Sequence, residues 1–435
     1  MPEFDAIIVG GGPAGASAAI ELAASGARVL LAERERFPRE KLCGEFISPE
    51  CLGHFARLGV LERMNQGGGA RVSETVFYAP SGRGVSVPSE WFGGGVGGDA
   101  LGLSRAEMDA RLLARAREAG AVVLEEAALA GVVVEGARVR GVRLHTHGSE
   151  VREFRARVTL DATGRGRALV RRAGRELDRE GKRGGAPSGV GFFGASQEGG
   201  ASQEGGEGGA DRRARRNGGG SRAQLVAFKA HLEGSRGAPG VCEIYFYPGG
   251  YGGLSPVEGG LSNLCFIARA RDVRGHASDP ERVVREVLTR NRRAAQTLDG
   301  VRARTRWLGV SVESFGRHEP APFDGLLAVG DAAAFIDPFT GSGMLMALEG
   351  GLLAARAVTR WLAGGGDGFA PLARAYRAAY VARFDARLRL CGLLRRAALA
   401  PPALAEAAVL ALGASAGLRR RLARATRGNE VDGRQ

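Results

Sequence analysis

The chain has 435 residues, of which 44% are hydrophobic, and it carries a formal net charge of +14. This length and composition suffice for two domains with substantial cores. No run of eighteen uninterrupted apolar residues occurs and the chain starts directly in an apolar strand, so we expect a cytoplasmic protein without a signal peptide or membrane span. The five cysteines form no C-x-x-C pair, which argues against a zinc site or a disulfide framework, and we predict no metal.

The positive charge comes almost entirely from arginine, since only Lys41, Lys182 and Lys229 are lysines. An excess of basic residues can indicate nucleic-acid binding. Here the arginines are scattered among abundant alanine and glycine, and no nucleic-acid-binding motif accompanies them. We therefore expect a solvated basic surface and no nucleic-acid partner, with an anionic substrate, a carrier protein or a peripheral membrane contact left open.

The N-terminal segment has the pattern of a nucleotide-binding βαβ unit. An apolar strand at 4–9 leads into a helical run at 16–25, and a second apolar strand at 27–32 ends on Glu33. The intervening turn has the G-x-G-x-x-G spacing, with a carboxylate about 20 residues later. The predicted cofactor-binding residues of this turn are Gly10, Gly12, Pro13, Ala14 and Gly15.

Each glycine of this turn has a physical role. Gly10 permits the tight bend, Gly12 lets a pyrophosphate approach the backbone, and Gly15 lets helix and strand pack closely. The free N–H groups at the start of the helix then face the phosphates. Glu33 would accept a hydrogen bond from an unphosphorylated ribose, so FAD and NAD both satisfy this motif.

Two later motifs follow predicted strands. The strand at 156–160 ends in Asp161 and Gly164, an acidic turn in which the backbone passes close to a ligand, and a solvated turn carboxylate is the less favoured alternative for Asp161. The strand at 325–329 delivers Gly330 and Asp331. Before the long helix expected at 345–362 come the remaining motif residues, Pro338, Gly341, Ser342, Gly343 and Met344.

In this order the three motifs resemble those of the flavoprotein superfamily of aromatic hydroxylases and geranylgeranyl reductases, and the resemblance covers about 1–362. It implies that FAD is the cofactor and that Asp331 binds its ribityl hydroxyls. It also implies that the backbone N–H groups at 341–343 lie beside the pyrimidine edge of the flavin, where the positive end of the following helix stabilises negative charge. Arg105 matches the arginine that begins a helix and touches the cofactor in this superfamily.

A shorter signature at 37–45 resembles the P-R-x-K-x-C-G segment of geranylgeranyl reductase-like enzymes, which lies close to the flavin. It adds to the predicted cofactor site, together with a neighbouring arginine, the residues Arg34, Arg39, Lys41, Cys43 and Gly44. Cys43 is either a redox or substrate-facing thiol or an idle buried cysteine. The stretch 245–257, where reductases and halogenases of the superfamily carry a G-x-x-W motif, contains no tryptophan, which weakens both assignments.

The predicted fold is α/β: a Rossmann-like, three-motif FAD-binding domain interleaved with a β-sheet substrate domain, followed by C-terminal helices. We assign 1–70, 100–182 and 275–362 to the first domain, and 71–99 and 183–274 to the second. Strands are expected at 71–79, 189–194, 223–231, 241–247 and 262–268. The substrate pocket is expected to be lined by aromatic residues, each of which could instead be plain core: Phe193, Phe228, Tyr245 and Phe246.

Two further segments have unusual composition. Residues 196–222 are repetitive and rich in glycine and arginine, so they cannot bury enough apolar area to offset their ordering entropy, and we expect a mobile insertion. Residues 363–435 form a predicted helical region. This region either caps the FAD-binding domain or provides a membrane-surface or dimer helix.

The motifs leave the reaction open. No second framed G-x-G-x-x-G unit is present, so NAD(P)H would bind only transiently as the reductant, and no catalytic residue is identified. The leading hypothesis is an NAD(P)H-dependent monooxygenase that hydroxylates or epoxidises a hydrophobic phenolic, polyketide or terpenoid molecule in secondary metabolism. The alternatives are a geranylgeranyl reductase-like enzyme acting on C=C bonds, and a flavin electron-transfer or binding protein without substrate turnover.

Overall fold

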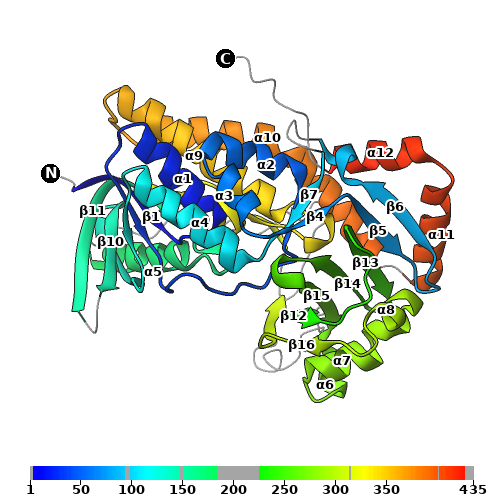
Figure 1. The fold of residues 1–435 in the computed structure, drawn as a ribbon. Coiled ribbons are helices and arrows are strands. Elements are labelled where there is room, and N and C mark those ends of the chain that lie inside the picture. Colours follow the sequence, from blue (N-terminus) through cyan, green and yellow to red (C-terminus); the bar gives the residue numbers. More distant parts are fainter. Residues whose placement is uncertain are drawn as a thin grey trace, which may run out of the picture.

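The computed structural model describes residues 3–93, 98–146, 150–183, 225–312, 315–399 and 401–426. Two large sheets lie side by side in the molecule, and helices cover the first sheet and one end of the second (Figure 1). The predicted α/β fold with a FAD-binding-type domain, a second sheet and C-terminal helices is confirmed. The predicted insertion at 196–222, the predicted strand at 189–194 and Phe193 lie outside the described residues.

The first sheet contains the N-terminal βαβ unit. Its strands run in the order β8-β2-β1-β11-β10-β9, with β19 also paired to β11. The C-terminal half of β11 pairs in parallel with β1 and β19, whereas its N-terminal half pairs antiparallel with β10. The strands are β1 (Phe4–Val9), β2 (Val29–Ala32), β8 (Val122–Leu124), β9 (Ala128–Glu135), β10 (Arg138–Thr146), β11 (Glu150–Asp161) and β19 (Leu326–Ala328).

Helices α1 (Pro13–Ala24), α4 (Arg105–Glu118) and α9 (Gly343–Ala363) pack together on this sheet. The approach of α1 to α9 is close, because the Ser17 hydroxyl lies 3.3 Å from the Leu348 carbonyl oxygen and a Cβ on Gly351 would clash with the Ala14 carbonyl. Helix α5 (Ala168–Arg183) packs on β9. The sequence expectation of a long helix after residue 344 is confirmed.

The second sheet has eight strands, in the order β16-β12-β15-β14-β13-β5-β6, with β17 also paired to β12. These strands are β5 (Glu74–Tyr78), β6 (Gly84–Pro88), β12 (Leu225–Glu233), β13 (Val241–Tyr247), β14 (Gly250–Pro256), β15 (Ser262–Arg269), β16 (Arg302–Ala303) and β17 (Leu308–Val312). A small three-stranded sheet has the order β3 (Phe46–Ile47), β7 (Ala100–Gly102) and β4 (Ala70–Val72). Its strand β4 comes directly before β5 in the chain.

The division expected at residue 275 differs from the observed packing. Strands β16 and β17 pair with β12 of the second sheet. Helices α6 (Ala270–Gly275), α7 (Pro280–Glu286) and α8 (Arg292–Thr297) bury Val273, Val283 and Ala294 in one core with Phe228 and Tyr245 of that sheet. The segment up to about residue 312 is therefore part of the second domain, because its apolar side chains cover the second sheet and not the first.

The C-terminal region is helical, as expected. Helix α10 (Ala370–Ala398) packs on α9, while α11 (Pro402–Gly413) and α12 (Ala416–Ala425) pack against β6 and the 3-10 turn η1 (Ser89–Phe92). Figure 1 shows α11 and α12, in red, beside β5 and β6 at the end of the molecule farthest from β10. Within the described part of the chain, no helix has the length and hydropathy needed to cross a membrane.

Candidate cofactor and substrate site

A cavity of about 1150 Å³ extends from the N-terminal βαβ turn to the C-terminal helices. Between them it runs along the face of the second sheet that is not covered by α6–α8. Its volume exceeds the 300 to roughly 1000 Å³ typical of one ligand site. Most of the predicted cofactor residues line it: Gly10, Gly12, Pro13, Ala14, Glu33, Arg34, Arg39, Lys41, Cys43, Gly44, Arg105, Gly164, Asp331, Gly341, Gly343 and Met344. The three motifs and the 37–45 signature thus converge on one space.

The turn after β1 leaves room for a ligand at one glycine only. Gly10 has φ +110°, and a Cβ there would clash with the Ala162 carbonyl, whereas a Cβ on Gly15 would clash with the Gly10 carbonyl. Gly15 therefore supports the turn and does not line the cavity. The nearest atoms to a Cβ on Gly12 are the Nη2 atoms of Arg105, at 3.7 Å, and Arg39, at 3.9 Å, so its backbone is open toward two cations.

Glu33 is fixed at the end of β2. One carboxylate oxygen accepts a hydrogen bond from the Gly11 N–H at 2.8 Å, and the other accepts one from the Glu35 N–H at 3.1 Å. The side chain is buried and lines the cavity. Carboxylate oxygens carry more than one acceptor site each, so Glu33 retains capacity for a ribose hydroxyl.

Three cations lie at this end of the cavity. The guanidinium groups of Arg39 and Arg105 both bind the buried Asp109, at 2.8 Å and 2.7 Å. Burial, followed by the charges of Arg39, Arg105 and Arg34, lowers the pKa of Lys41. Arg39 also lies 3.8 Å from Glu33, so Asp109 and Glu33 share the charge of the two arginines. A pyrophosphate at this end would bring further negative charge, which would stabilise the protonated form of Lys41.

Asp331 offers a carboxylate without a protein partner. It lines the cavity in η5 (Gly330–Ala332), and among the residues that the structure describes none donates a hydrogen bond to its side chain. Burial raises the pKa of Asp331, against the lowering effect of Arg105, Lys41 and Arg165. A half-buried carboxylate that faces a cavity can accept hydrogen bonds from a ligand, and the ribityl hydroxyls implied by the resemblance have that chemistry.

The start of α9 also faces the cavity. Gly341 has φ +61°, a conformation that favours glycine, and it lines the cavity two residues before this 21-residue helix. Gly343, the first residue of the helix, also lines the cavity. The unpaired N–H groups and positive dipole end of a long helix stabilise negative charge. The geometry therefore agrees with the predicted contact to the electron-accepting edge of a flavin.

Besides Gly15, three predicted cofactor residues whose side chains the structure describes do not line the cavity, namely Asp161, Gly330 and Ser342. Asp161 is fully buried and accepts hydrogen bonds from the N–H groups of Thr163 and Val170, both at 2.9 Å, so it holds its own turn onto α5 and is neither a ligand contact nor a solvated carboxylate. Gly330 lies against Ala14, where a Cβ would come within 2.8 Å of the Ala14 Cβ. The Ser342 hydroxyl bonds to Thr340. Pro338 begins the 3-10 turn η6 (Pro338–Thr340), and its side chain lies outside the described part of the chain.

The 37–45 segment is anchored to the second sheet by residues that the sequence analysis did not single out. Lys229 Nζ lies 2.9 Å from one oxygen of Glu45 and also binds Glu40, while His231 Nε2 lies 2.6 Å from the other Glu45 oxygen. The Asn263 side-chain amide donates to the Cys43 carbonyl at 2.9 Å. A lysine and a histidine two residues apart on one predicted strand are unusual in the sequence, but no local pattern identifies Glu45 as their partner.

Glu40, Glu45 and His231 are also the one group among the described residues whose ligand atoms lie within 4.8 Å of one another, a spacing that could hold a metal ion. The Lys229 ammonium contacts both carboxylates and already supplies the compensating charge. The absence of a metal stays a prediction. We interpret the cluster as an ion network in which Lys229 and His231 of the second sheet bind the 37–45 segment of the first domain.

Cys43 lines the cavity and lies close to Arg105 and Glu45. Burial raises its pKa, and the Arg105 charge lowers it by less. The thiol form is therefore favoured at neutral pH, which makes Cys43 a poor nucleophile. Its position facing the cavity keeps a substrate-facing role open, and this role stays a prediction.

The far half of the cavity is apolar. Phe246 lines it, as predicted, with ring centroids 6.5 Å from Phe77 and 5.6 Å from Phe339. The other lining side chains of this apolar arm come from β6, β13, α11 and α12 and include Val85, Val87, Ile244, Val409, Leu412, Leu422 and Ala423. The arm thus connects the cofactor end of the cavity to the C-terminal helices.

The predictions for Phe228 and Tyr245 are wrong. Both are buried in the core beneath α6–α8, on the opposite face of the second sheet, while their strand neighbours Ala227 and Phe246 line the cavity. Successive strand residues point to opposite faces, so a pattern of adjacent aromatics cannot place all of them in one pocket. The Tyr245 hydroxyl instead donates to buried Glu243 at 2.9 Å.

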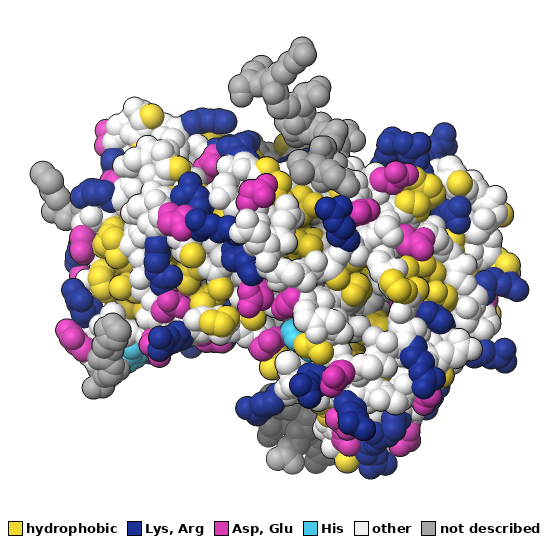
Figure 2. Space-filling model, viewed as in Figure 1, with side chains coloured by type: hydrophobic (Ala, Val, Ile, Leu, Met, Phe, Trp, Pro, Cys, Tyr) yellow, Lys and Arg dark blue, Asp and Glu magenta, His cyan; other side chains and the backbone are white. Residues whose placement is uncertain are grey.

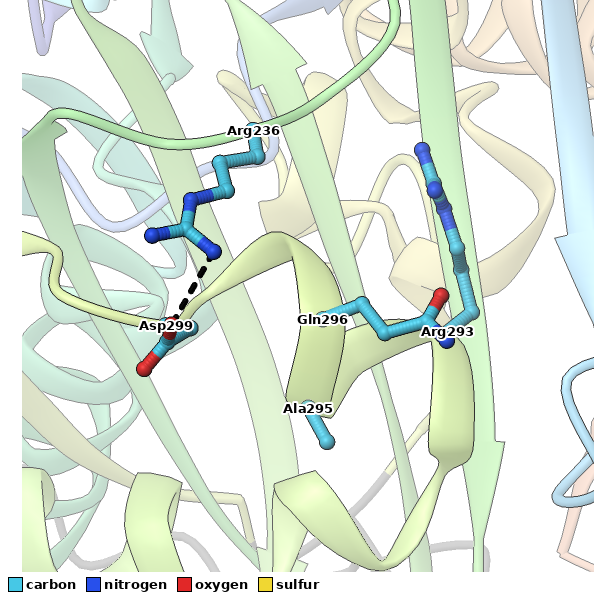
Figure 3. Close-up of a pocket in the computed structure, with 5 residues that line it drawn as sticks. All are labelled: Arg236, Arg293, Ala295, Gln296 and Asp299. Atoms are coloured by element: carbon cyan, nitrogen blue, oxygen red, sulfur yellow. Dashed lines mark ion pairs between the residues drawn. The ribbon is translucent and has the colours of Figure 1, made fainter.

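A second, smaller pocket of about 480 Å³ lies at α8, away from the cavity (Figure 3). Arg236 pairs with Asp299 at 3.0 Å, and Arg293 turns inward to bind Glu243 at 2.6 Å. Both cations that line the pocket are therefore already paired. We assign no ligand to it.

Comparisons with known proteins agree with this geometry. Residues 3–192 match the model of a family described as FAD binding domain. The chain is 28% identical over 359 residues to digeranylgeranylglycerophospholipid reductase 2 of Methanopyrus kandleri, which covers 81% of this chain and 76% of that protein. Two solved structures at 20% identity share the fold. A geranylgeranyl bacteriochlorophyll reductase-like protein of Thermoplasma acidophilum has a TM-score of 0.73 over 98% of this chain and 96% of that one. The flavin-dependent brominase Bmp2 has a TM-score of 0.71 over 97% and 93%.

Proposed function

Because residues 3–192 of this FAD-dependent oxidoreductase match the FAD binding domain family, we propose that it reduces carbon–carbon double bonds of a lipophilic, isoprenoid-type substrate. The sequence motifs alone favour a monooxygenase. The similarity to a digeranylgeranylglycerophospholipid reductase over 81% of the chain supports the reductase alternative better. NAD(P)H as the transient reductant remains part of this proposal.

The observation that carries the proposal is the continuity of the cavity. Its polar end holds the cations and carboxylates suited to an adenine dinucleotide, and its apolar arm runs without interruption between β6, β13 and the C-terminal helices. A long hydrocarbon chain needs such a dry, extended channel beside the reacting centre. A compact phenol would leave most of this arm unfilled.

The residues of the chain have distinct tasks in this reaction. Arg39 and Arg105 offer positive charge to the phosphates, and Asp331 accepts from a ligand hydroxyl. Phe246 and its aromatic neighbours exclude water from the apolar arm. FAD, when bound and reduced, supplies the hydride equivalent, so the protein contributes binding, orientation and a water-free site.

The test uses the purified FAD-loaded protein with a digeranylgeranylglycerophospholipid dispersed in detergent micelles. Under anaerobic conditions, with dithionite, NADH or NADPH as the reductant, mass spectrometry should show the gain of two hydrogen atoms for each double bond reduced. The Asp331→Ala variant, freed of flavin, serves as the control. A product that forms only with oxygen and carries an added oxygen atom would instead establish the monooxygenase. Flavin reduction with no organic product would favour the electron-transfer alternative.

A further inference from the structure

Helix α11 is apolar nearly all the way round, although it lies on the surface. Its only charged residue is Glu406, whose carboxylate accepts hydrogen bonds from the N–H of Ser81 at 2.7 Å and from its hydroxyl at 2.8 Å. One side of the helix packs on β5 and β6 through Val409 and Leu412. A surface helix normally has a polar side facing water, so the outer side of α11 is suited to an apolar environment.

The exposed leucines of the protein gather in this region. Seven large hydrophobic residues are exposed among the described residues, and the four leucines all lie between 393 and 418: Leu393 at 60%, Leu404 at 59%, Leu410 at 51% and Leu418 at 44%. Leu404 and Leu410 belong to α11. Single exposed apolar residues are ordinary, but their concentration on adjoining helices indicates an interaction surface.

Positive charge borders these leucines. Helix α12 contains Arg419, Arg420, Arg421 and Arg424 and no acidic residue, and the last three of these are exposed. Figure 2 shows Lys and Arg side chains next to hydrophobic ones where Figure 1 places α12. Leucine beside arginine is the composition of helices that lie in the interface of a membrane containing anionic lipids.

The same helices form one end of the cavity. Ala405, Ala408 and Leu412 of α11, together with Leu422 of α12, line the apolar arm, and Ala408 is also exposed. The apolar arm therefore meets the molecular surface at the apolar helix. A lipid that leaves a bilayer beneath α11 could enter the arm without crossing water.

We propose that α11 and α12 dock on the surface of an anionic lipid bilayer, with the outer leucines of α11 in the interface and the arginines of α12 on the headgroups. The lipid entry route rests on the proposed function, whereas the docking itself does not. Charge complementarity favours a membrane over a second copy of this chain, because two copies of the same arginine-rich surface would repel each other.

The experiment measures sedimentation of the full-length, FAD-loaded protein with vesicles of phosphatidylcholine alone or with added phosphatidylglycerol. We expect binding to the anionic vesicles that weakens at high salt. The double variant Leu404→Glu/Leu410→Glu should lose at least tenfold in affinity, and Arg420→Glu/Arg421→Glu should lose the preference for phosphatidylglycerol. Matched controls are Val122→Glu/Val151→Glu, at exposed valines of the first sheet, and Arg271→Glu/Arg274→Glu on α6.

Flavin content and circular dichroism establish that each variant is folded. The proposal is overturned if the α11 variants bind anionic vesicles as the wild type does, or if light scattering shows that they only convert a dimer into a monomer. Turnover separates docking from the reaction. The α11 variants should reduce micelle-dispersed substrate at the wild-type rate and vesicle-embedded substrate at least tenfold more slowly. If the protein binds vesicles but reduces no substrate, the reductase proposal is wrong and the docking proposal stands.

Discussion

Lys229 and Glu45 are 184 residues apart in the sequence, yet the Lys229 ammonium lies 2.9 Å from the Glu45 carboxylate in the buried seam between the two domains. The same carboxylate oxygen accepts the Arg105 N–H at the start of α4, also at 2.9 Å. One side chain of the 37–45 segment therefore ties the helix that carries a cofactor-facing arginine to the second sheet.

Removal of the Lys229 ammonium should destabilise the folded protein. The Lys229→Met variant keeps the stem volume but leaves Glu45 buried beside His231 without its ammonium partner, and we expect a loss of about 3 to 5 kcal/mol in the free energy of unfolding. Urea unfolding followed by circular dichroism measures it. The control is Arg236→Ala, which breaks the exposed pair with Asp299 and should cost less than about 1 kcal/mol. Equal effects of the two variants would contradict the assignment.

The cofactor half of the site could be predicted from the sequence because it rests on local rules. A strand, a glycine turn and a helix specify the approach of a phosphate within fifteen residues, and Gly10, Gly12 and Glu33 all lie where the spacing places them. The Lys229–Glu45 pair and the burial of Asp161 depend on contacts between distant segments. No local pattern encodes those contacts. Phe228 and Tyr245 were misplaced because the face of a strand is decided by its partners in the sheet.

The glycines of the N-terminal turn should differ in what they support. Gly12→Ala places a methyl group where the nearest atoms are 3.7 Å away or more, so the protein should fold normally while FAD affinity falls at least tenfold. Gly15→Ala drives a methyl group into the Gly10 carbonyl and should destabilise the fold itself. Thermal unfolding of the flavin-free proteins and titration with FAD separate the two effects. Unchanged FAD affinity in Gly12→Ala would contradict a pyrophosphate at this turn.

Asp331 should govern cofactor binding. A hydrogen bond to a charged acceptor contributes about 1.5 to 3 kcal/mol, so Asp331→Ala should weaken FAD binding about 10- to 100-fold. The flavin absorbance of the purified protein and calorimetric titration with FAD provide the measurement. Asp324→Ala, at a half-exposed carboxylate that pairs with Arg138 at 3.5 Å, is the matched control and should retain its flavin. Stoichiometric FAD in Asp331→Ala would exclude the assigned role.

The two faces of the second sheet should respond differently to loss of an aromatic ring. Phe228→Ala removes a side chain from the core beneath α6–α8 and should cost about 3 to 5 kcal/mol in unfolding free energy, with little change in KM for a lipid substrate. Phe246→Ala widens the apolar arm and should cost less stability, but raise KM several-fold. Denaturant unfolding and steady-state kinetics on the same preparations provide the comparison. A raised KM in Phe228→Ala alone would reverse the assignment of the two faces.

Glu349 of α9 should make stability depend on acid pH. Burial raises its pKa, but the hydrogen bond from His54 and the charges of Arg387 and Arg383 outweigh that effect and lower the pKa from 4.5 to about 2. A carboxyl with a depressed pKa stabilises the folded state above its unfolded value, and this contribution is lost as the pH falls from about 4.5 toward 2. The lowering corresponds to about 3 kcal/mol at pH 7.

Glu349→Gln should therefore lose about that much stability at pH 7 relative to the wild type, and the difference should shrink below pH 4.5. Urea unfolding at pH 7, 4 and 3 tests this, with Glu62→Gln on the exposed side of α3 (Leu61–Gln66) as the control. A difference that stays constant over this range would show that the variant acts through packing and not through charge.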